Sequence, residues 1–497
     1  MNYKDYTLIT ADSRKVIPGS LFVAIKGAAS DGHDYIAQAI AQGATGIICE
    51  HVPEGLLSSG MGTFSLANNR ADARENAPIP SNETASKGVQ IEVVENSRRA
   101  LALAADEFYG HPSGKLTLVG ITGTNGKTTT VTLLYRLFMQ LGYHCGLLST
   151  IANYVGTRRE ETRNTTVDPV TLNRLLAQMV EEGCEYCFME VSSIGVEQDR
   201  VTGLDFKMGI FSNLTHDHLD YHKTFAEYLR CKKLFFDMLP AQAVALVNTD
   251  DKHGPVMVQN TRARVVSYSV KGLADHTARI LEQGVDGMLL KMDGTETWVR
   301  LIGEHNAYNL LAIYSAAVEL GANATETLVA LSNLESAPGR LENLSGPRGI
   351  TAVIDYAHTP DALENVLKAL RAIAPKRPLI CLFGCGGDRD KTKRPEMAAI
   401  AEKLSDRLII TSDNPRTEQP EAIIADIKAG LSPAAMAKTL CITDRREAIR
   451  TALLTAPQDA TVLLAGKGHE TYQEVGHTKY PMDEKEIVTE TYKLITE

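Results

Sequence analysis

The sequence predicts an α/β protein of three domains from its length, the alternation of strand-like and helical segments, and two breaks rich in proline and glycine. A chain of 497 residues is longer than one hydrophobic core usually organises. The breaks fall at 109–115 and 336–349. We therefore expect domains at 1–108, 109–337 and 338–497.

The first domain is expected to be a small α/β unit. The run "SLFVAIKG" at 20–27 has the apolar character of a strand, and "YIAQAIAQGA" at 35–44 has helical spacing. The segment 55–88 is polar and rich in Gly, Ser and Asn, without a sustained period. We expect loops there.

The middle domain begins with "LTLVGITGTNGKTTT" at 116–130, which reads as a strand, a glycine-rich loop and the start of a helix that ends near Gly142. The apolar runs "CFMEVSS", "MGIFSNL" and "VALVNTDD" follow, separated by helical segments. This alternation predicts a mostly parallel sheet of the type found in P-loop ATPases.

The glycine-rich loop is the strongest local signal of function. Backbone N–H groups between Gly123 and Gly126 could hold phosphate oxygens at a helix N-terminus, with Lys127 near the terminal phosphates and the Thr128 hydroxyl on Mg²⁺. The strict G-x-x-x-x-G-K-[ST] spacing is not met, because Ile121 stands where the first glycine belongs. A plain Gly/Thr-rich turn is the alternative; the flanking strand and helix favour nucleotide binding.

Two further strand ends carry groups that suit a metal. Glu190 ends the run "CFME", and a cluster follows "MGIFS" that contains Asn213, His216, Asp217 and His218. Singly, each of these residues is better explained as a helix cap, a turn amide or a surface histidine. Together, near a phosphate loop, they indicate a Mg²⁺-assisted phosphoryl site.

The last domain repeats one design four times: an apolar strand followed by a polar or glycine-rich tip. The four segments are "ITAVIDYAH", "RPLICLFGCGGDRD", "RLIITSDNPR" and "TVLLAGKGHE". In a doubly wound, Rossmann-like sheet, ligands bind at the carboxyl ends of the strands. The sequence therefore predicts that the four tips line one cleft.

Composition excludes several classes of protein. The net charge of −10 argues against sequence-independent binding of nucleic acid. No stretch of 18 apolar residues and no signal-like start occur, so we expect neither secretion nor membrane insertion. The eight cysteines are scattered, which predicts reduced thiols in a cytoplasmic protein; Cys184 and Cys187 form a lone CxxC without a second pair for zinc.

Nine motifs in this order resemble the Mur ligases across essentially the whole chain: "GITGTNGKTT", "EVSSIGVEQDR", "NLTHDHLDYH", "GEHNAYN", "PGRLE", "DYAHTPDAL", "FGCGGDRD", "SDNPRTE" and "GKGHE". The resemblance implies an ADP-forming acid–amino-acid ligase of peptidoglycan precursor synthesis. ATP and Mg²⁺ would activate the D-glutamyl carboxylate of UDP-N-acetylmuramoyl-L-alanyl-D-glutamate as an acyl phosphate, and meso-2,6-diaminopimelate would attack it. We expect a cytoplasmic monomer.

The resemblance also implies roles for individual residues. It places catalysis at Lys127, Glu190, His218 and Lys232. ATP binding is implied for Thr122, Gly123, Thr124, Asn125, Gly126, Lys127, Thr128, Asn306, Asn309, Arg340 and Asp355. Metal ligands are implied at Thr128, Glu190, His218 and Lys232, the last as a carbamate; solvated helix lysines at Lys232 and Lys233 are the alternative.

The two remaining substrate sites are assigned in the same way. The small N-terminal domain would bind the UDP end of its substrate, with contacts implied for Ser13, Asn164, Thr165, Thr166, Ser192, Gln198 and Arg200. Diaminopimelate contacts are implied for Arg389, Asp413, Asn414, Pro415, Arg416, Gly466 and Glu470. A guanidinium at Arg416 suits the distal carboxylate that lysine lacks.

Some residues depart from the family pattern, and rival interpretations stay open. Ile194 stands where histidine is common, His305 where an aromatic is usual, and "PMDEKE" resembles the expected acidic motif only loosely. A ligase like folylpolyglutamate synthase and a non-catalytic nucleotide-binding regulator are the alternatives. For "DNPR" itself, a solvated surface turn is the simple alternative.

Overall fold

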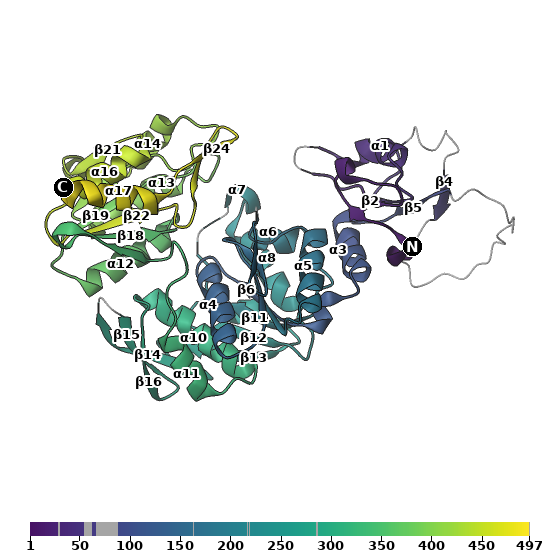
Figure 1. Ribbon diagram of the computed structural model, residues 1–497, viewed down its shortest axis with the longest axis horizontal. Coiled ribbons are helices and arrows are strands. Elements are labelled where there is room, and N and C mark those ends of the chain that lie inside the picture. The colour runs from purple at the N-terminus through teal and green to yellow at the C-terminus, as the bar shows by residue number, and fades with distance from the viewer. Residues whose placement is uncertain are drawn as a thin grey trace. The chain divides into compact units, whose positions relative to one another are not determined.

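The computed structural model describes residues 1–27, 30–53, 62–65, 88–162, 164–215, 217, 219–284 and 287–496, and for 62–65 it describes the backbone. The chain forms two units. The first contains Met1–Leu118, His144–Cys187 and Val191–Phe206, and the second contains Val119–Tyr143, Phe188–Glu190 and Lys207–Glu497. Each is described by itself below (Figure 1).

A parallel sheet organises the N-terminal part of the first unit. Its order is β1-β2-β3-β5-β4, with β1 Ile9–Thr10, β2 Leu21–Val23, β3 Gly46–Cys49, β4 Gly62–Ser65 and β5 Val89–Val93. All four pairings are parallel. Phe22 packs into one core, whereas Leu21 and Val23 pack into another that contains Leu101. The sheet therefore buries side chains on both faces, as a parallel sheet requires.

The expectation of loops at 55–88 is wrong for β4, where four residues add a strand to this sheet. Apart from β4 and Gly88, that segment lies outside the described residues. The remaining elements of the unit are α1 Ile36–Ala41, α3 Ser97–Phe108, β7 Cys145–Leu148, β8 Asn153–Val155, β9 Arg158–Glu160, α5 Pro169–Glu181 and α6 Ser193–Glu197, with short 3₁₀ turns η1 Tyr3–Asp5, η2 Ser13–Lys15, η3 Gly32–Tyr35 and η4 Pro112–Lys115.

The second unit contains the middle sheet. Its strands follow the order β16-β15-β14-β13-β12-β11-β6-β10, to which β6 and β10 contribute their C-terminal residues. The strands are β6 Thr117–Thr122, β10 Tyr186–Glu190, β11 Phe206–Phe211, β12 Val244–Asn248, β13 Arg264–Ser269, β14 His276–Gly284, β15 Gly287–Met292 and β16 Thr295–Val299. The helices are α4 Lys127–Gln140, α7 Leu219–His222, α8 Phe225–Asp237, α9 Gly254–Met257, α10 Glu304–Glu319 and α11 Ala324–Ser332.

This sheet is not parallel throughout. Strands β11, β12, β13 and β14 pair in parallel, but β14, β15 and β16 form an antiparallel meander. The meander is a feature that the sequence analysis did not predict. Helix α4 begins and ends close to the prediction, and Gly142 after it has a φ of 92°, the left-handed conformation that commonly ends a helix.

The C-terminal sheet has the order β17-β18-β22-β19-β20-β21. The pairings are parallel except for β17 with β18. Its strands are β17 Glu342–Ser345, β18 Thr351–Asp355, β19 Leu379–Phe383, β20 Arg407–Ile410, β21 Thr439–Cys441 and β22 Thr461–Ala465, and a separate hairpin is formed by β23 Tyr472–Val475 and β24 Thr478–Pro481.

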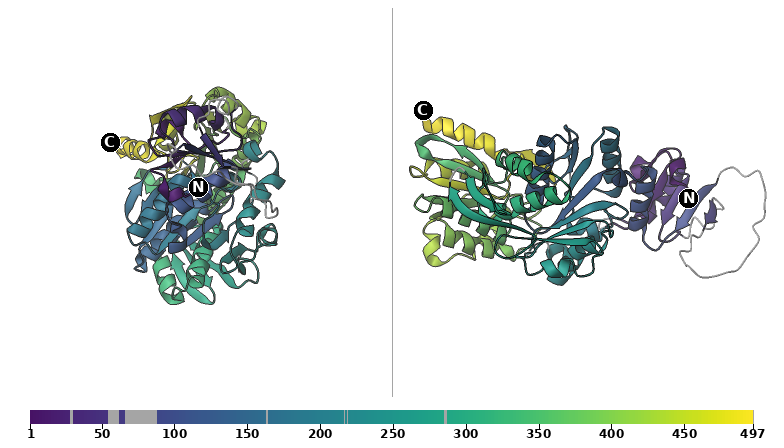
Figure 2. Two further views of the ribbon diagram at one scale, coloured as in Figure 1. Left: turned by 90° about the vertical axis from the view of Figure 1, so that its right-hand side faces the viewer. Right: turned by 90° about the horizontal axis from the view of Figure 1, so that it is seen from below.

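Helices cover both faces of the C-terminal sheet (Figures 1 and 2). One core joins the strands to α12 Pro360–Ile373, α13 Lys393–Leu404 and α14 Pro420–Lys428. The opposite core joins them to α16 Arg445–Leu454 and α17 Glu484–Thr496; the short elements η5 Pro347–Gly349 and α15 Pro433–Met436 complete this part. Because the helices lie on the two faces, the four polar tips begin together at the carboxyl ends of the strands.

Among the described residues, none of the helices combines the length and the apolar character needed to cross a membrane.

Candidate functional site

The glycine-rich loop joins the end of β6 to the first turn of α4. Gly126 is the residue before α4 and has a φ of 88°, and a Cβ at this position would lie 2.5 Å from Asn309 Oδ1. Glycine is required there for both reasons, since a side chain would meet strain and a close neighbour. Gly126 thus leads into the first turn of α4, a helix N-terminus of the kind where anions bind. The expectation that the N–H groups of Thr124 and Asn125 hold phosphate is wrong in this structure, because both donate to Asn213.

The loop is held from β11 by two polar side chains. Asn213 accepts a hydrogen bond from Asn125 N at 2.9 Å and donates to Asn125 O at 3.1 Å, while Ser212 Oγ donates to the same carbonyl at 2.7 Å. On its other side, Asn125 Nδ2 donates to Asp361 Oδ2 at 2.7 Å. Asn213 was predicted from the sequence as a metal-site residue; in the structure its side chain holds the backbone of the loop at Asn125.

Two lysines converge on one carbonyl of the loop. Lys127 Nζ donates to Gly123 O at 2.8 Å and to Thr124 O at 2.9 Å, and Lys232 Nζ donates to Gly123 O at 2.7 Å. Lys232 is 1% exposed. Burial lowers the pKa of Lys127, and it lowers that of Lys232 further, with the neighbouring charge of Lys127 as the second cause.

Lys233 behaves differently from its neighbour. Its Nζ pairs with the Asp237 carboxylate one turn along α8, at 2.6 and 2.8 Å. Of the two adjacent lysines, Lys232 is thus the one that reaches the phosphate loop.

The structure describes some of the expected metal ligands and not others. Glu190, at the end of β10, is 1% exposed, and its carboxylate and that of Asp217 act on the pKa of Lys127 in the upward direction. Thr128 Oγ1 lies 3.3 Å from Arg340 Nη2, which donates to it. His216 and His218 lie outside the described residues. Within the described ranges, no group of three His, Cys, Asp or Glu side chains is arranged to hold a metal by itself.

The hydroxyls at the start of the loop are buried. Thr124 Oγ1 lies 3.0 Å from the Tyr228 hydroxyl and accepts a hydrogen bond from Thr215 N at 2.9 Å. Thr122 Oγ1 has no hydrogen-bond partner in the part of the chain that the structure describes. Thr124 therefore fixes the loop, and Thr122 is the last residue of β6.

A cavity of about 380 Å³ opens beside the loop in the second unit. Its size is within the usual range for small-molecule sites. The lining includes these residues expected at the nucleotide: Asn125, Gly126, Asn306, Asn309, Arg340 and Asp355.

The residues around this cavity orient one another. Asn309 Nδ2 donates to Asn306 Oδ1 at 3.0 Å, and Asp355 accepts from the backbone N–H groups of Leu341 and Ala357. The Arg340 guanidinium lies 4.7 Å from the centre of the Tyr356 ring, and its Nε has no hydrogen bond to any described residue. A half-buried guanidinium whose buried Nε–H is unused, next to a phosphate loop, is suited to an anion.

His305, which departs from the family pattern, also lines this cavity. Burial lowers its pKa to about 4. The ring is therefore neutral at physiological pH and can lie against an uncharged aromatic or sugar group.

A second cavity, of about 980 Å³, lies in the first unit. Four residues expected at the UDP substrate line it, namely Ser13, Asn164, Gln198 and Arg200. Arg200 donates to Gln198 Oε1 at 2.7 Å and to Thr166 O, so the wall is held together by hydrogen bonds. The lining also contains cations that the sequence analysis did not single out: Arg14, Lys15, Arg98 and Arg174. Several cations in one pocket suit a substrate with more than one anionic group.

Of three other residues expected at the same substrate, two hold backbone groups in the structure and the third bonds to a side chain. Ser192 Oγ accepts from Gly195 N at 3.0 Å and caps α6, and Thr166 Oγ1 accepts from Ser192 N at 3.0 Å. Thr165 Oγ1 accepts from the Thr150 hydroxyl at 3.1 Å. They do not line the cavity, so their contact with substrate stays a prediction.

In the C-terminal sheet, the tips of β19 and β20 contact each other through their backbones. Gly387 N donates to Asn414 O at 2.9 Å, and a Cβ on Gly387 would lie 1.9 Å from Pro415 O. The glycine-rich sequence after β19 is thus explained by the close passage of "DNPR". Buried Arg394 supports the tip of β19 by donating hydrogen bonds to Glu418 and to Gly386 O.

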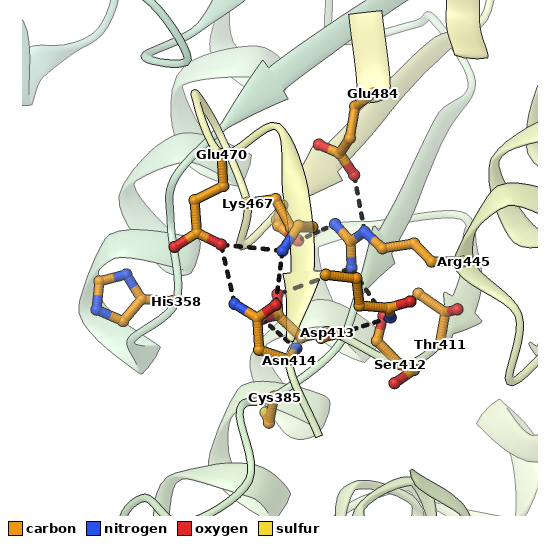
Figure 3. A network of polar contacts seen from close by, with 12 residues as sticks. His358, Cys385, Thr411, Ser412, Asp413, Asn414, Arg445, Lys467, Glu470 and Glu484 are labelled. Carbon is orange, nitrogen blue, oxygen red and sulfur yellow. Dashed lines mark hydrogen bonds and ion pairs between the residues drawn. The ribbon is translucent and has the colours of Figure 1, made fainter. Parts of the chain in front are cut away.

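The Asn414 side chain makes three hydrogen bonds within the protein. Its Oδ1 accepts from Lys467 Nζ and Glu474 N, both at 2.9 Å, and its Nδ2 donates to Glu470 Oε2 at 2.9 Å. Lys467 Nζ also donates to Glu470 Oε2 at 2.9 Å, which closes a triangle (Figure 3). Asn414 therefore joins the tips of β20 and β22, and Glu470 is the carboxylate of this triangle.

Arg416 lies at the end of the same tip with a φ of 49°, an uncommon backbone conformation for a side chain of this size. Its Nε donates to Glu474 Oε2 at 3.1 Å and its Nη1 to Gly387 O at 2.8 Å. Its Nη2 makes no hydrogen bond to the described part of the chain. The guanidinium is thus fixed on one side and has a nitrogen left for a ligand.

Of the remaining residues expected at diaminopimelate, Asp413 and Gly466 lie together: a Cβ on Gly466 would be 2.6 Å from Asp413 Oδ2. Arg389 is exposed on the tip after β19. Lys467 was not predicted as a site residue, although it stands inside the quoted "GKGHE", and neither were Arg445 and Glu484. Glu484 could have been found in "PMDEKE", whereas Arg445 belongs to no motif.

Comparison with known proteins gives a consistent result. Three family models match the chain: the Mur ligase family catalytic domain at 5–109, the Mur ligase middle domain at 121–317, and the Mur ligase glutamate ligase domain at 339–468. The matched ranges agree with three domains, while the bounds predicted from sequence stay a prediction.

Two curated relatives carry the name UDP-N-acetylmuramoyl-L-alanyl-D-glutamate–2,6-diaminopimelate ligase. One, from Cytophaga hutchinsonii, is 48% identical over 98% of this chain and 94% of the relative. The other, from Parabacteroides distasonis, is 50% identical over 98% of this chain and 95% of the relative. A solved structure of an enzyme with the same name matches with a TM-score of 0.66 at 30% identity, over 99% of this chain and 96% of that one.

The loop geometry predicts unequal effects of two glycine substitutions at the ends of α4. Gly126→Ala and Gly142→Ala both place a side chain at a left-handed φ, but only the first meets a neighbour, since nothing lies within 4 Å of a Cβ at Gly142. We expect Gly126→Ala to weaken ATP binding by at least about tenfold, or about 1.4 kcal/mol, and Gly142→Ala to leave it nearly unchanged. Isothermal titration calorimetry on both variants measures this; equal affinities would contradict the role of the loop.

Proposed function

The chain belongs to the Mur ligase family, and we propose that it adds meso-2,6-diaminopimelate to the D-glutamyl carboxylate of UDP-N-acetylmuramoyl-L-alanyl-D-glutamate. ATP supplies the γ-phosphate that converts this carboxylate into an acyl phosphate. The diaminopimelate amine attacks the acyl carbon, and phosphate leaves as the amide forms. The reaction serves peptidoglycan precursor synthesis in the cytoplasm, and the enzyme acts as a monomer.

The observation that carries the proposal is the strand-tip site around Asn414 and Arg416. Diaminopimelate has a second amino-acid centre, with a carboxylate and an ammonium. Arg416, held by Glu474 and Gly387, offers Nη2 to that carboxylate. Glu470 and Asp413 offer carboxylates to the ammonium, and Asn414 fixes the position of Glu470. Lysine lacks the second carboxylate and would leave Arg416 without its partner.

Activation of the carboxylate depends on the phosphate loop. Backbone N–H groups at the start of α4 hold the phosphates, and Lys127 can exchange its contacts with Gly123 O and Thr124 O for phosphate oxygens. Arg340, beside Thr128, adds a second cation where negative charge accumulates. The acidic net charge of the chain is thus compensated locally at the reacting groups.

The donor set fits Mg²⁺. The Thr128 hydroxyl and the Glu190 carboxylate are oxygen ligands of the type Mg²⁺ prefers, and His218 is the third residue that we assign. When bound, Mg²⁺ neutralises charge on the transferred phosphate. As an ammonium, Lys232 cannot ligate a cation. As a carbamate it would present two oxygens. The ammonium groups of Lys127 and Lys232 both donate to Gly123 O, and two full positive charges so close together would repel each other. This repulsion supports modification of one of the two amines.

Phosphate release tests the function as a whole. We expect the protein to release phosphate from ATP in the presence of both UDP-N-acetylmuramoyl-L-alanyl-D-glutamate and meso-2,6-diaminopimelate, and not when either is omitted. Release that needs a folate in place of these substrates would favour the ligase alternative. Nucleotide binding without turnover under every condition would favour the regulator.

The carbamate predicts a chemical rescue. Lys232→Ala should reduce turnover by roughly a hundredfold, because an anionic group at the reacting phosphate is lost, and acetate or propionate in the buffer should restore part of it. Lys233→Ala is the matched control, since its partner is Asp237 on the helix surface. Full activity of Lys232→Ala, or a loss that no short carboxylate relieves, would remove the carbamate from the mechanism.

A further inference from the structure

Behind the strand-tip site lies a fully buried arginine that no motif contains. Arg445 is the first residue of α16, and its side chain is 0% exposed. Its Nε donates to Glu484 Oε1 at 2.7 Å, its Nη2 to Ala465 O at 2.8 Å and its Nη1 to Ser412 O at 3.4 Å. Each nitrogen of the guanidinium thus has a different partner (Figure 3).

Two of these partners belong to strands that are not neighbours. Ala465 is the last residue of β22, Ser412 follows β20, and β19 lies between these strands in the sheet. Backbone pairing alone therefore does not connect the two tips. Arg445 does so from α16, with a rigid planar group whose N–H directions are fixed.

The same guanidinium faces the first residue of "DNPR". Asp413 Oδ2 lies 3.9 Å from Arg445 Nη1, and Asp413 Oδ1 accepts from Asn414 N at 2.7 Å. Asp413 O accepts from Gln473 Nε2. The Asp413 carboxylate is consequently oriented by two contacts, one with the Arg445 guanidinium from α16 and one with the backbone N–H of Asn414.

Stability alone is a weak reason for this arrangement. Taking a guanidinium and a carboxylate out of water costs several kcal/mol per ion, and an apolar pair of similar volume is often as stable. A neighbouring pair provides a comparison: Arg446, the next residue of α16, pairs at 3.3 Å with Glu490, which lies further along α17, and both side chains are partly exposed. That pair links α16 to α17 without reaching a strand tip, so a link between these helices does not by itself require a buried arginine.

We propose that Arg445, held by Glu484, is a positioning residue for the amino-acid substrate. It fixes the tips of β20 and β22 relative to each other, so that Asp413, Asn414 and Glu470 meet the distal ammonium in one geometry. The inference rests on the proposed function and adds a residue that acts on diaminopimelate binding through others. Arg445 itself does not touch the substrate.

The test separates the amino-acid step from the ATP step. For wild type, Arg445→Met and Arg445→Lys, the KM is measured for meso-diaminopimelate, for ATP and for the UDP-dipeptide, together with formation of the acyl phosphate trapped by borohydride in the absence of diaminopimelate. We expect Arg445→Met to raise the diaminopimelate KM by about tenfold to a hundredfold, because small misplacements of binding groups have effects of this size. The other two KM values and acyl phosphate formation per folded enzyme should stay near wild type. Arg445→Lys keeps the charge but not the fork, and an intermediate KM is expected.

Matched variants distinguish positioning from general destabilisation. Arg446→Met makes the same chemical change one residue away and should leave all three KM values unchanged. Leu453→Ala removes a fully buried side chain from the same helix and should lower the melting temperature without selective loss of diaminopimelate binding. If Arg445→Met does not fold, Glu484→Gln removes only the charge of its partner and should raise the diaminopimelate KM selectively, to a smaller extent.

The inference is overturned if Arg445→Met or, where that variant fails to fold, Glu484→Gln lowers the melting temperature with an unchanged diaminopimelate KM, or raises all three KM values together. These outcomes differ from failure of the proposed function, in which the wild-type enzyme itself would show no turnover that depends on diaminopimelate.

Discussion

Parallel pairing of four strands in the C-terminal sheet is the constraint on which the strand-tip site depends. The register places Asp355 opposite Ala465, Ala465 opposite Phe383, and Phe383 opposite Ile410, so that β18, β22, β19 and β20 end in one row. Every tip begins at the same edge because of this alignment. The polar residues come from four distant segments, yet they need only short loops to meet. A shift of one strand by a single residue would move its tip out of the row and exchange the faces of its side chains.

Local cations explain how an acidic chain can serve anionic substrates. Arg416 lies at the strand tips, and Lys127 and Arg340 lie at the phosphate loop. Hydrogen bonds to carbonyl, carboxylate and hydroxyl oxygens hold these charged groups and offset part of the cost of removing the charge from water. The strands and helices around these charged groups hold them in position. Their geometry is therefore set before a substrate arrives, which is how binding energy is converted into specificity.

The sequence predicted those features that depend on neighbours along the chain. The glycine-rich loop, helix α4 and the alternation of strands with polar tips are all encoded within short windows, and the structure confirms them. Features that depend on contacts between distant segments were missed. Arg445 looks like an ordinary helical arginine until β20 and β22 are placed around it, and β4 lies in a polar segment without strand periodicity. Ser192 and Thr166 show the converse: their motif suggested a ligand, and the fold uses them to hold backbone.

The claim that the β20 tip selects the substrate by its second carboxylate is tested most directly by Arg416→Ala. The quantity to measure is the ratio of kcat/KM for meso-diaminopimelate to that for L-lysine, in the variant and in the wild-type enzyme. We expect the ratio to fall by at least about tenfold, mainly through loss of diaminopimelate turnover, because a charge-assisted hydrogen bond to the distal carboxylate is removed. An unchanged ratio would contradict the account, and "DNPR" would then be a tip that serves the fold alone; the solvated surface turn is already wrong, because Asp413 and Asn414 are buried.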